Sequence, residues 1–99
     1  MMPAYLIVHI TVHDPVVFAQ YRDQVTPIIE RHGGRYIARG GATEIVEGSV
    51  APRLVVVEFP DMATARAFYH GAEYAPAMAL RKSCSTADIV IGEGLLPSL

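Results

Sequence analysis

The sequence predicts an α+β fold in which helices cover one face of an antiparallel β-sheet. Short runs rich in β-branched residues alternate along the chain with longer segments of helical period. Two of the helical segments begin at an aspartate that can cap a helix, Asp14 and Asp61. The chain has only 99 residues and contains no linker or repeat, which indicates a single domain over residues 1–99.

The first predicted strand is AYLIVHITV, residues 4–12, a short run rich in β-branched side chains. Successive side chains of a strand point to opposite faces of the sheet. One face of this strand is wholly apolar and consists of Leu6, Val8, Ile10 and Val12. The other face, which carries His9, is mixed. We therefore expect the apolar face to pack beneath the helices.

A helix is predicted to follow directly. Asp14 can accept hydrogen bonds from the first free N–H groups, and Pro15 suits the first helical position. Apolar side chains then recur at helical spacing as far as His32, where Gly33-Gly34 provides a left-handed stop. Pro27 lies within this helix and removes one backbone hydrogen bond, which predicts a bend and not two separate helices.

The remaining residues predict three strands and two helical segments. In order these are a strand over 35–41 and 43–48, a strand over 53–59, a helix over 61–70, a helical segment over 73–82 and a strand over 86–92. We expect the first of these strands to be broken or bulged at Gly40-Gly41, because glycine weakens the interior of a strand.

This order, β-α-β-β-α-β, is that of a ferredoxin-like split β-α-β fold with helices on one face of the sheet. The first and third strands are expected to lie side by side and parallel at the centre, with the second strand beside the third and the fourth beside the first. The face away from the helices has no cover within 99 residues. A second copy of the chain would cover it, so the fold predicts a homodimer that forms a dimeric α/β barrel.

The composition favours association of two copies and excludes some classes of partner. Hydrophobic residues make up 52% of the chain and charged residues 18%, which is more apolar surface than one small domain buries. The net charge of −2 provides no basic surface for nucleic acid. A single cysteine, Cys84, excludes an internal disulfide, and no run resembles a signal peptide or a membrane span. We therefore expect a cytoplasmic protein that binds neither nucleic acid nor membrane.

Several segments resemble those of a known family. They are AYLIVHITVHDP, YRDQV, HGGRYIARGG, EIVEG, VVVEFPD, EYAPAMALR and the closing IGEG. Together they resemble the family named domain of unknown function 1330, over nearly the whole chain. That family is similar to the dimeric α/β-barrel superfamily, so the resemblance implies a homodimer of ferredoxin-like subunits whose sheets enclose a cavity. It implies no particular reaction, since relatives in the wider superfamily include cofactor-independent monooxygenases, isomerases and haem enzymes.

Glu58 ends the most hydrophobic run of the chain and is the first candidate catalytic residue. If Phe59 packs beneath the helices, alternation places Glu58 on the opposite face. His9 would face the same way on the adjacent strand, within hydrogen-bonding reach, so the two would form a general acid/base pair. In the alternative interpretation, Glu58 ends its strand at the wet rim, bonded to a backbone N–H or to an arginine across the dimer, and His9 is an interface histidine.

Two arginines and a tyrosine are candidates for binding an anionic substrate. Arg39 and Arg81 are the cations expected near the carboxylate. Arg81 follows Tyr74 by seven residues, so both would lie on one side of their helical segment and would suit a small carboxylate or enolate. The alternative for Arg81 is an exposed helix end. Tyr21 lies on the apolar stripe of the first helix and is expected in the core.

The sequence predicts neither a metal site nor a cofactor. His9 and His13 are four residues apart on an extended chain, about 13 Å, which is too far for one metal ion. The paired glycines belong to neither a GxxxxGK nor a GxGxxG motif, so no nucleotide cofactor is expected. Cys84 has no histidine beside it in the sequence and is expected to be an ordinary small residue.

Three functions remain open. The first is a cofactor-independent enzyme acting on a small organic acid or enol, in which Glu58 and His9 transfer a proton and Arg39 or Arg81 holds the anion. The second is a non-catalytic binding module that uses the same cavity between the sheet and the partner subunit. The third is a purely structural homodimer with a filled barrel, which a cavity of roughly 300 Å³ with converging polar groups would exclude. We favour a small-molecule site, whose catalytic status the sequence does not decide.

Overall fold

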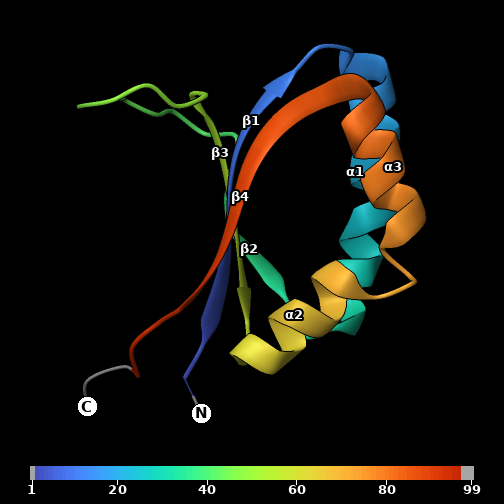
Figure 1. Cartoon of the computed structure of the whole chain (residues 1–99), viewed down its shortest axis with the longest axis vertical. Coiled ribbons are helices and arrows are strands. Elements are labelled where there is room, and N and C mark those ends of the chain that lie inside the picture. Colours follow the sequence, from blue (N-terminus) through green and yellow to red (C-terminus); the bar gives the residue numbers. More distant parts are fainter. Residues whose placement is uncertain (1, 97–99) are drawn as a thin grey trace.

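A computed structural model describes residues 2–96 of the chain. Its elements in chain order are β1 (Ala4–Val12), α1 (Pro15–Arg31), β2 (Arg35–Arg39), β3 (Arg53–Phe59), α2 (Met62–His70), α3 (Ala75–Cys84) and β4 (Ser85–Glu93). The strands form one four-stranded sheet in the order β2-β3-β1-β4, and α1, α2 and α3 lie on the same side of it (Figure 1). The structure confirms the predicted α+β class and the predicted order of the strands.

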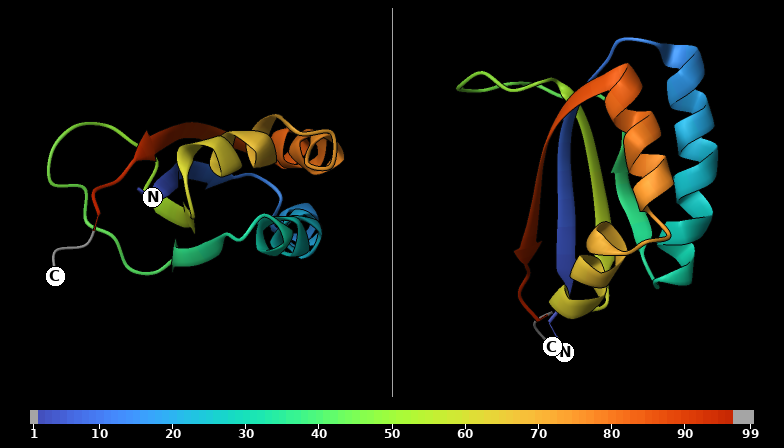
Figure 2. Two further views of the ribbon diagram at one scale, coloured as in Figure 1. Left: turned by 90° about the horizontal axis from the view of Figure 1, so that it is seen from below. Right: turned by 45° about the vertical axis from the view of Figure 1, so that its right-hand side comes forward.

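The helices form a layer over one face of the sheet. In Figure 2, α1 lies towards β2, whereas α2 and α3 lie towards β4. β3, α2, α3 and β4 match the segments expected from the sequence to within two residues at each end. The space between the two layers holds the core and, as described below, the candidate site.

All neighbouring strands of the sheet are antiparallel, and the expectation of parallel central strands was wrong. β1 and β3 run in opposite directions, so that Tyr5 lies opposite Glu58 and His9 lies opposite Leu54. The connections explain why. The crossover through α1 makes β2 run in the same direction as β1, and the chain then turns back after β2, so β3 is antiparallel to both.

Aspartates cap α1 and α2, as expected. Asp14 Oδ1 accepts hydrogen bonds from the backbone N–H groups of Val16 and Val17, at 3.1 and 3.2 Å. Asp61 Oδ1 accepts one from the N–H of Thr64 at 2.7 Å. These bonds satisfy donors that the first turn of a helix leaves free, and each cap typically contributes about 1 kcal/mol.

The end of α1 depends on two glycines. The helix continues through Pro27 as one element and ends at Arg31, and Gly33 has a left-handed φ of +73°. Gly34 follows in close contact with the core, where a Cβ atom would lie 2.7 Å from the side chain of Phe59. Only glycine fits both requirements, the positive φ at the first position and the close approach at the second.

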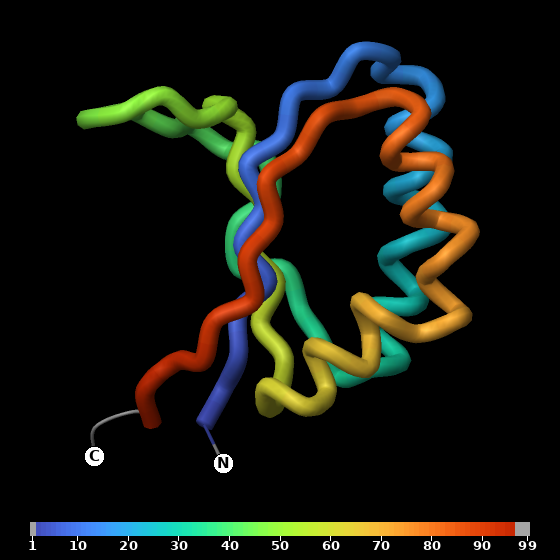
Figure 3. The backbone as a smooth tube through the Cα atoms, in the orientation of Figure 1, coloured from blue at the N-terminus to red at the C-terminus, as the bar shows by residue number. Residues whose placement is uncertain are grey.

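The second strand is shorter than expected. Residues 43–48 form no strand and pair with none of the four strands in the described part of the chain. Gly40, with φ +72°, turns the chain out of the sheet, and residues 40–52 form an arm that projects away from the helices (Figure 3). The expected irregularity exists, but it lies within β2, where the pairing shifts between Tyr36 and Ala38, and not at the paired glycines.

The hydrophobic core lies between the sheet and the helices. Leu6, Val8 and Ile10 on the apolar face of β1 are buried there, as predicted, and Val12 packs against them partly buried. Val57 and Phe59 of β3 are buried in the same core. Three aromatic rings join the layers: the ring centres of Phe59 and Phe68 are 5.2 Å apart, and those of Phe68 and Tyr74 are 4.7 Å apart. Aromatic contacts at these distances add to the stabilisation that burial itself provides.

No helix covers the opposite face of the sheet, here called the open face. Its side chains include Ile7, His9, Leu54, Val56, Glu58 and Val90. Most of these residues are apolar, and Val90 is 62% exposed. A small protein rarely leaves such a surface in contact with water, so the open face is suited to association.

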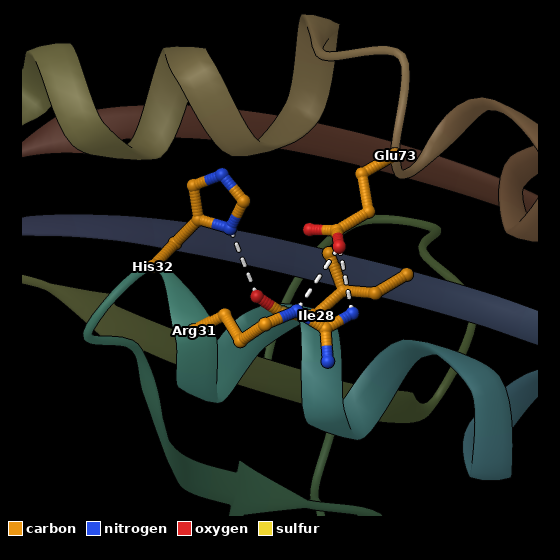
Figure 4. Close-up of polar contacts among 4 residues, drawn as sticks. All are labelled: Ile28, Arg31, His32 and Glu73. Carbon is orange, nitrogen blue, oxygen red and sulfur yellow. Dashed lines mark hydrogen bonds and ion pairs between the residues drawn. The ribbon is translucent and has the colours of Figure 1, made fainter.

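Polar contacts tie the end of α1 to the connection between α2 and α3 (Figure 4). Arg31 forms an ion pair with Glu73, with 2.8 Å between its terminal nitrogen and the carboxylate oxygen. His32 donates from Nδ1 to the carbonyl oxygen of Ile28 at 2.9 Å. Both members of the ion pair are about half exposed, so this pair contributes at most about 1 kcal/mol.

Candidate functional site

The structure separates His9 from Glu58. Both lie on the open face, as predicted, but the antiparallel register places Glu58 opposite Tyr5, four residues along β1 from His9. That separation corresponds to about 13 Å along the strand, which is too far for a hydrogen bond. The expected His9–Glu58 acid/base pair is therefore wrong within one chain. His9 instead donates from Nδ1 to the carbonyl oxygen of Ala51 at 3.3 Å.

Glu58 has a different partner from those expected. Arg35, directly opposite on β2, places its Nε atom 3.0 Å from the carboxylate. The side chain of Glu58 is 26% exposed and that of Arg35 is 71% exposed. The contact agrees with the interpretation of Glu58 as a strand-end residue bonded to an arginine. The arginine, however, belongs to the neighbouring strand of the same chain and not to a partner subunit.

Arg39 does not take part in a cluster with Arg81. It lies exposed at the end of β2, with its guanidinium carbon 4.8 Å from the ring centre of Tyr36. Arg53, which sequence reasoning missed, lies on the helix side of β3 with its guanidinium carbon 5.2 Å from the ring centre of Phe18. The sequence did contain a signal for this position. Arg53 lies two residues before Val55 on the same strand, so both side chains face the helices.

Arg81 and Tyr74 are close together inside the core. The seven-residue spacing therefore correctly predicted that both lie on one side of their helical segment. Tyr74 precedes the first turn of α3 and is 2% exposed, and Arg81 lies two turns later and is 4% exposed. Arg81 Nε donates to the hydroxyl of Tyr74 at 3.3 Å, and a terminal nitrogen donates to the hydroxyl of Tyr69 at 3.5 Å. The alternative of an exposed helix end is excluded for Arg81.

Tyr21 completes this group, which we call the tyrosine–arginine cluster: Tyr21, Tyr69, Tyr74 and Arg81. The hydroxyl oxygens of Tyr21 and Tyr74 are 2.9 Å apart. Tyr21 was expected in the core and does pack against it, but its hydroxyl is also part of the candidate site. The cluster brings together α1, the end of α2 and both ends of α3, so it depends on how the helices pack.

A cavity of about 40 Å³ lies beside the cluster, between the sheet and the helices. Its walls are mostly apolar side chains of β1, β3 and α1, and its polar atoms come from Tyr21, Tyr36, Tyr74 and Arg81. This inner cavity is on the helix side of the sheet, whereas the sequence analysis expected a cavity on the open face. The volume holds a few water molecules or the polar head of a ligand, and it is well below the roughly 300 Å³ of a typical ligand site.

The cluster has an excess of hydrogen-bond donors. Arginine carries only donors, and among residues 2–96 no carboxylate forms an ion pair with Arg81. Its two hydrogen bonds, at 3.3 and 3.5 Å, are longer than the usual 2.7–3.2 Å range. Tyr36 is engaged elsewhere: Thr26 Oγ1 donates to the carbonyl oxygen of Arg22, so the Tyr36 hydroxyl donates to Thr26 Oγ1 at 3.1 Å and has no hydrogen bond to Arg81 among the described residues. The cluster therefore lacks the anionic acceptor that a buried guanidinium normally has.

The protonation states follow from burial. Burial first, and then the neighbouring Tyr74, raises the pKa of Tyr21 far above its usual value, so Tyr21 is a neutral phenol. Burial, the largest single influence, would lower the pKa of Arg81, but Tyr74, Tyr21 and Tyr69 together outweigh it, and the pKa is raised. The cluster thus combines the fixed positive charge of Arg81 with the neutral phenol of Tyr21.

The family follows from the sequence match. Over residues 3–95 the chain matches the family described as Domain of unknown function (DUF1330). The chain belongs to this family. The DUF1330 match covers every strand and helix described above. No curated protein sequence matches the chain.

Solved structures resemble this DUF1330 chain in fold. RPA0582, a protein of unknown function from Rhodopseudomonas palustris, has a TM-score of 0.76 and 17% identity, and the match covers 97% of this chain and 85% of that one. SnoaB, a cofactor-independent oxygenase from Streptomyces nogalater, has a TM-score of 0.68 and 15% identity over 98% and 97% of the two chains. A dimeric protein of unknown function with a ferredoxin-like fold, from Bacteroides fragilis, has a TM-score of 0.60 and 12% identity over 93% and 96%. At these identities the likeness establishes the ferredoxin-like fold alone.

Within residues 2–96, no group of three or more His, Cys, Asp or Glu side chains is arranged to bind a metal ion. Among the described helices, none combines the length and the apolar character needed to cross a lipid bilayer.

Proposed function

We propose that this DUF1330 protein binds a small organic acid or enolate, and that Arg81 and Tyr74 hold its anionic oxygen. The observation that carries the proposal is the buried guanidinium of Arg81, which has only two long hydrogen bonds to tyrosine hydroxyls and no carboxylate partner among the described residues. A buried cation of this kind is costly unless an anion compensates it. A ligand oxyanion in the inner cavity would provide that compensation.

The hydroxyl groups beside Arg81 suit the same ligand chemistry. Because Arg81 donates to Tyr74, the hydroxyl proton of Tyr74 is free to bond Tyr21, whose own proton then has no partner among the described residues. If Tyr21 donates to Tyr74 instead, the proton of Tyr74 is the free one. In either arrangement one phenol proton remains for the inner cavity, so a ligand there must offer an acceptor.

A catalytic role for this site is a further part of the proposal. Preorganised donors beside an enolate stabilise the charge that develops when a proton leaves carbon, and such chemistry needs no cofactor. SnoaB, a cofactor-independent oxygenase, has a similar fold. This likeness supports the proposal because it indicates that a protein of this fold can carry out chemistry without a cofactor. Glu58 and His9 face the other side of the sheet, so within one chain they do not serve a ligand bound at Arg81.

We also propose that two copies pair through the open face. The apolar side chains there, the exposed arm and the dimeric structure from Bacteroides fragilis all support this assembly. In such a dimer the inner cavity of each copy would stay on its own helix side. The ligand site and the dimer interface are therefore separate features of the fold.

The experiment that tests ligand binding is an NMR titration of the isotope-labelled protein with benzoate and, in parallel, with benzamide. Benzamide has the same shape as benzoate but no charge. We expect saturable shifts in α3 and around Tyr74 with benzoate and binding at least about tenfold weaker with benzamide, since the charged oxygen is the group that is recognised.

Two variants make the titration specific. Arg81→Met replaces the guanidinium by an apolar side chain that can fill the same space, and it should abolish the preference for benzoate. Arg39→Met removes an equal charge from the exposed end of β2 and should leave binding unchanged. Benzoate binding that survives Arg81→Met in a folded protein would refute the proposed function, as would the absence of any benzoate binding.

A further inference from the structure

We propose that the ligand carries a second anionic group, a carboxylate, which lies beside Lys82 in an open hollow outside the inner cavity. The inference rests on the proposed function, because it takes Arg81 as the anchor for the first oxyanion. It identifies the ligand class as a small organic compound with acidic groups at both ends.

The available space requires a ligand that extends beyond the inner cavity. That cavity measures about 40 Å³, enough for a polar head but not for an organic skeleton. A hollow of about 350 Å³ lies next to it, lined by Tyr69, Arg81, Lys82, Ser85 and Thr86 together with two apolar side chains. We call it the outer hollow. Arg81 and Ile89 line both spaces, so the inner cavity and the outer hollow adjoin at these two residues.

The Tyr69–Arg81 contact lies where the two spaces meet. At 3.5 Å it is the longest of the hydrogen bonds in the cluster, so it costs little to open. Tyr69 is only partly buried, and it also lines a second hollow of about 270 Å³ on its other side. A ligand oxygen that replaces the tyrosine hydroxyl on Arg81 would join the inner cavity to the outer hollow.

The outer hollow has the chemistry of a carboxylate site. Lys82 follows Arg81 in the last turn of α3, and within the part of the chain that the structure describes it forms no ion pair. Ser85 and Thr86 belong to the same wall; the Ser85 hydroxyl donates to the backbone carbonyl oxygen of Arg81 at 2.6 Å, and the Thr86 hydroxyl lies 2.9 Å from His13 Nε2. The flexible ammonium group of Lys82 recognises a carboxylate as a point charge.

The sign of the charge around these spaces is unusual for this chain. It has 10 acidic and 8 basic residues. Among the described residues, no Asp or Glu lines the inner cavity, the outer hollow or the second hollow beside Tyr69, whereas Arg66, Arg81 and Lys82 do. An acidic protein that keeps only basic groups at one opening attracts anions to it.

The test compares two ligands that differ in one charge. Terephthalate has two carboxylates, and monomethyl terephthalate has nearly the same shape but only one. Calorimetric titration of the full-length protein should show terephthalate binding at least about tenfold more tightly. Lys82→Gln should remove this preference and leave benzoate affinity unchanged within about twofold. Arg66→Gln is the matched control, because it removes one positive charge from the other side of Tyr69, and it should retain the preference.

The outcomes separate this inference from the proposed function. If both ligands bind equally, or if Lys82→Gln leaves the preference intact, the second carboxylate site is refuted, while benzoate binding that depends on Arg81 still supports the proposed function. An equal loss in Lys82→Gln and Arg66→Gln would mean a general attraction to positive charge, and it would also refute the Lys82 site. If neither terephthalate nor benzoate binds, both proposals fail.

Discussion

The hydroxyl oxygens of Tyr21 and Tyr74 lie 2.9 Å apart, although the two residues are separated by 53 positions in the sequence. Tyr21 comes from the middle of α1, and Tyr74 from the residue before α3. Their contact joins the two longest helices above the inner cavity, and Arg81 is bonded to one of them. The same polar contacts therefore contribute to the stability of the fold and to the proposed ligand site, and the two roles can be measured separately.

The first prediction concerns stability. Tyr74→Phe removes the hydroxyl that Arg81 Nε bonds, and it should lower the free energy of unfolding by about 1–3 kcal/mol, since a buried charged donor loses its partner. Tyr21→Phe keeps the Tyr74–Arg81 bond and should cost less. Urea unfolding of the two variants measures the difference. Equal losses would show that the bond to Arg81 has no special weight.

The second prediction concerns alkaline pH. Burial, and then Tyr74, raises the pKa of Tyr21 in the folded protein, whereas in the unfolded chain it titrates near its usual value of about 10. Above that pH the unfolded state binds fewer protons than the folded state, so stability falls as pH rises. Urea unfolding between about pH 8 and about pH 11, a range that spans the ordinary tyrosine pKa of about 10, measures this effect. The free energy of unfolding should decline more steeply with pH for the wild type than for Tyr21→Phe. Parallel curves would contradict the buried, neutral Tyr21.

The third prediction concerns Glu58. Glu58→Gln removes the ion pair with Arg35, which is 71% exposed, so the free energy of unfolding should change by less than about 1 kcal/mol. Thermal unfolding followed by circular dichroism is sufficient to test this. A loss of several kcal/mol would mean that Glu58 has a buried partner, for example across a dimer. Benzoate binding by this variant should equal that of the wild type.

The fourth prediction concerns assembly. Size-exclusion chromatography with light scattering should give a mass about twice the 10.8 kDa of one chain. Val90→Glu places a charge on the open face and should shift the protein towards monomer. The matched control is Val16→Glu, because Val16 is also an exposed valine, 72% against 62%, but lies on α1. A similar effect of both substitutions would argue against the open face as the interface.

Local features made most of the fold predictable. Caps, glycine stops and alternation depend on neighbouring residues, so α1, β3 and α2 were placed almost to the residue. The predicted strand over residues 43–48 was wrong. TEIVEG has the alternation of a strand, but none of the described strands pairs with it. One error in strand direction had larger consequences, since reversing β3 moves Glu58 from the neighbourhood of His9 to that of Tyr5.

The candidate site was predicted in part. The seven-residue spacing of Tyr74 and Arg81 on one helix was visible in the sequence, and the structure places them in contact. The contributions of Tyr21 and Tyr69 depend on how α1, α2 and α3 pack against each other. Helix packing brings together residues that are distant in sequence, so no local pattern could identify this group.

The central claim is that the buried guanidinium of Arg81 binds the anionic oxygen of a small ligand on the helix side of the sheet. The most direct measurement is a crystal structure of the protein with benzoate at saturating concentration. We predict a benzoate carboxylate within about 3.2 Å of the Arg81 guanidinium, with the contact between Arg81 and the Tyr69 hydroxyl broken. Benzoate bound instead on the open face beside Glu58 or His9, with the tyrosine–arginine cluster unchanged, would contradict the claim.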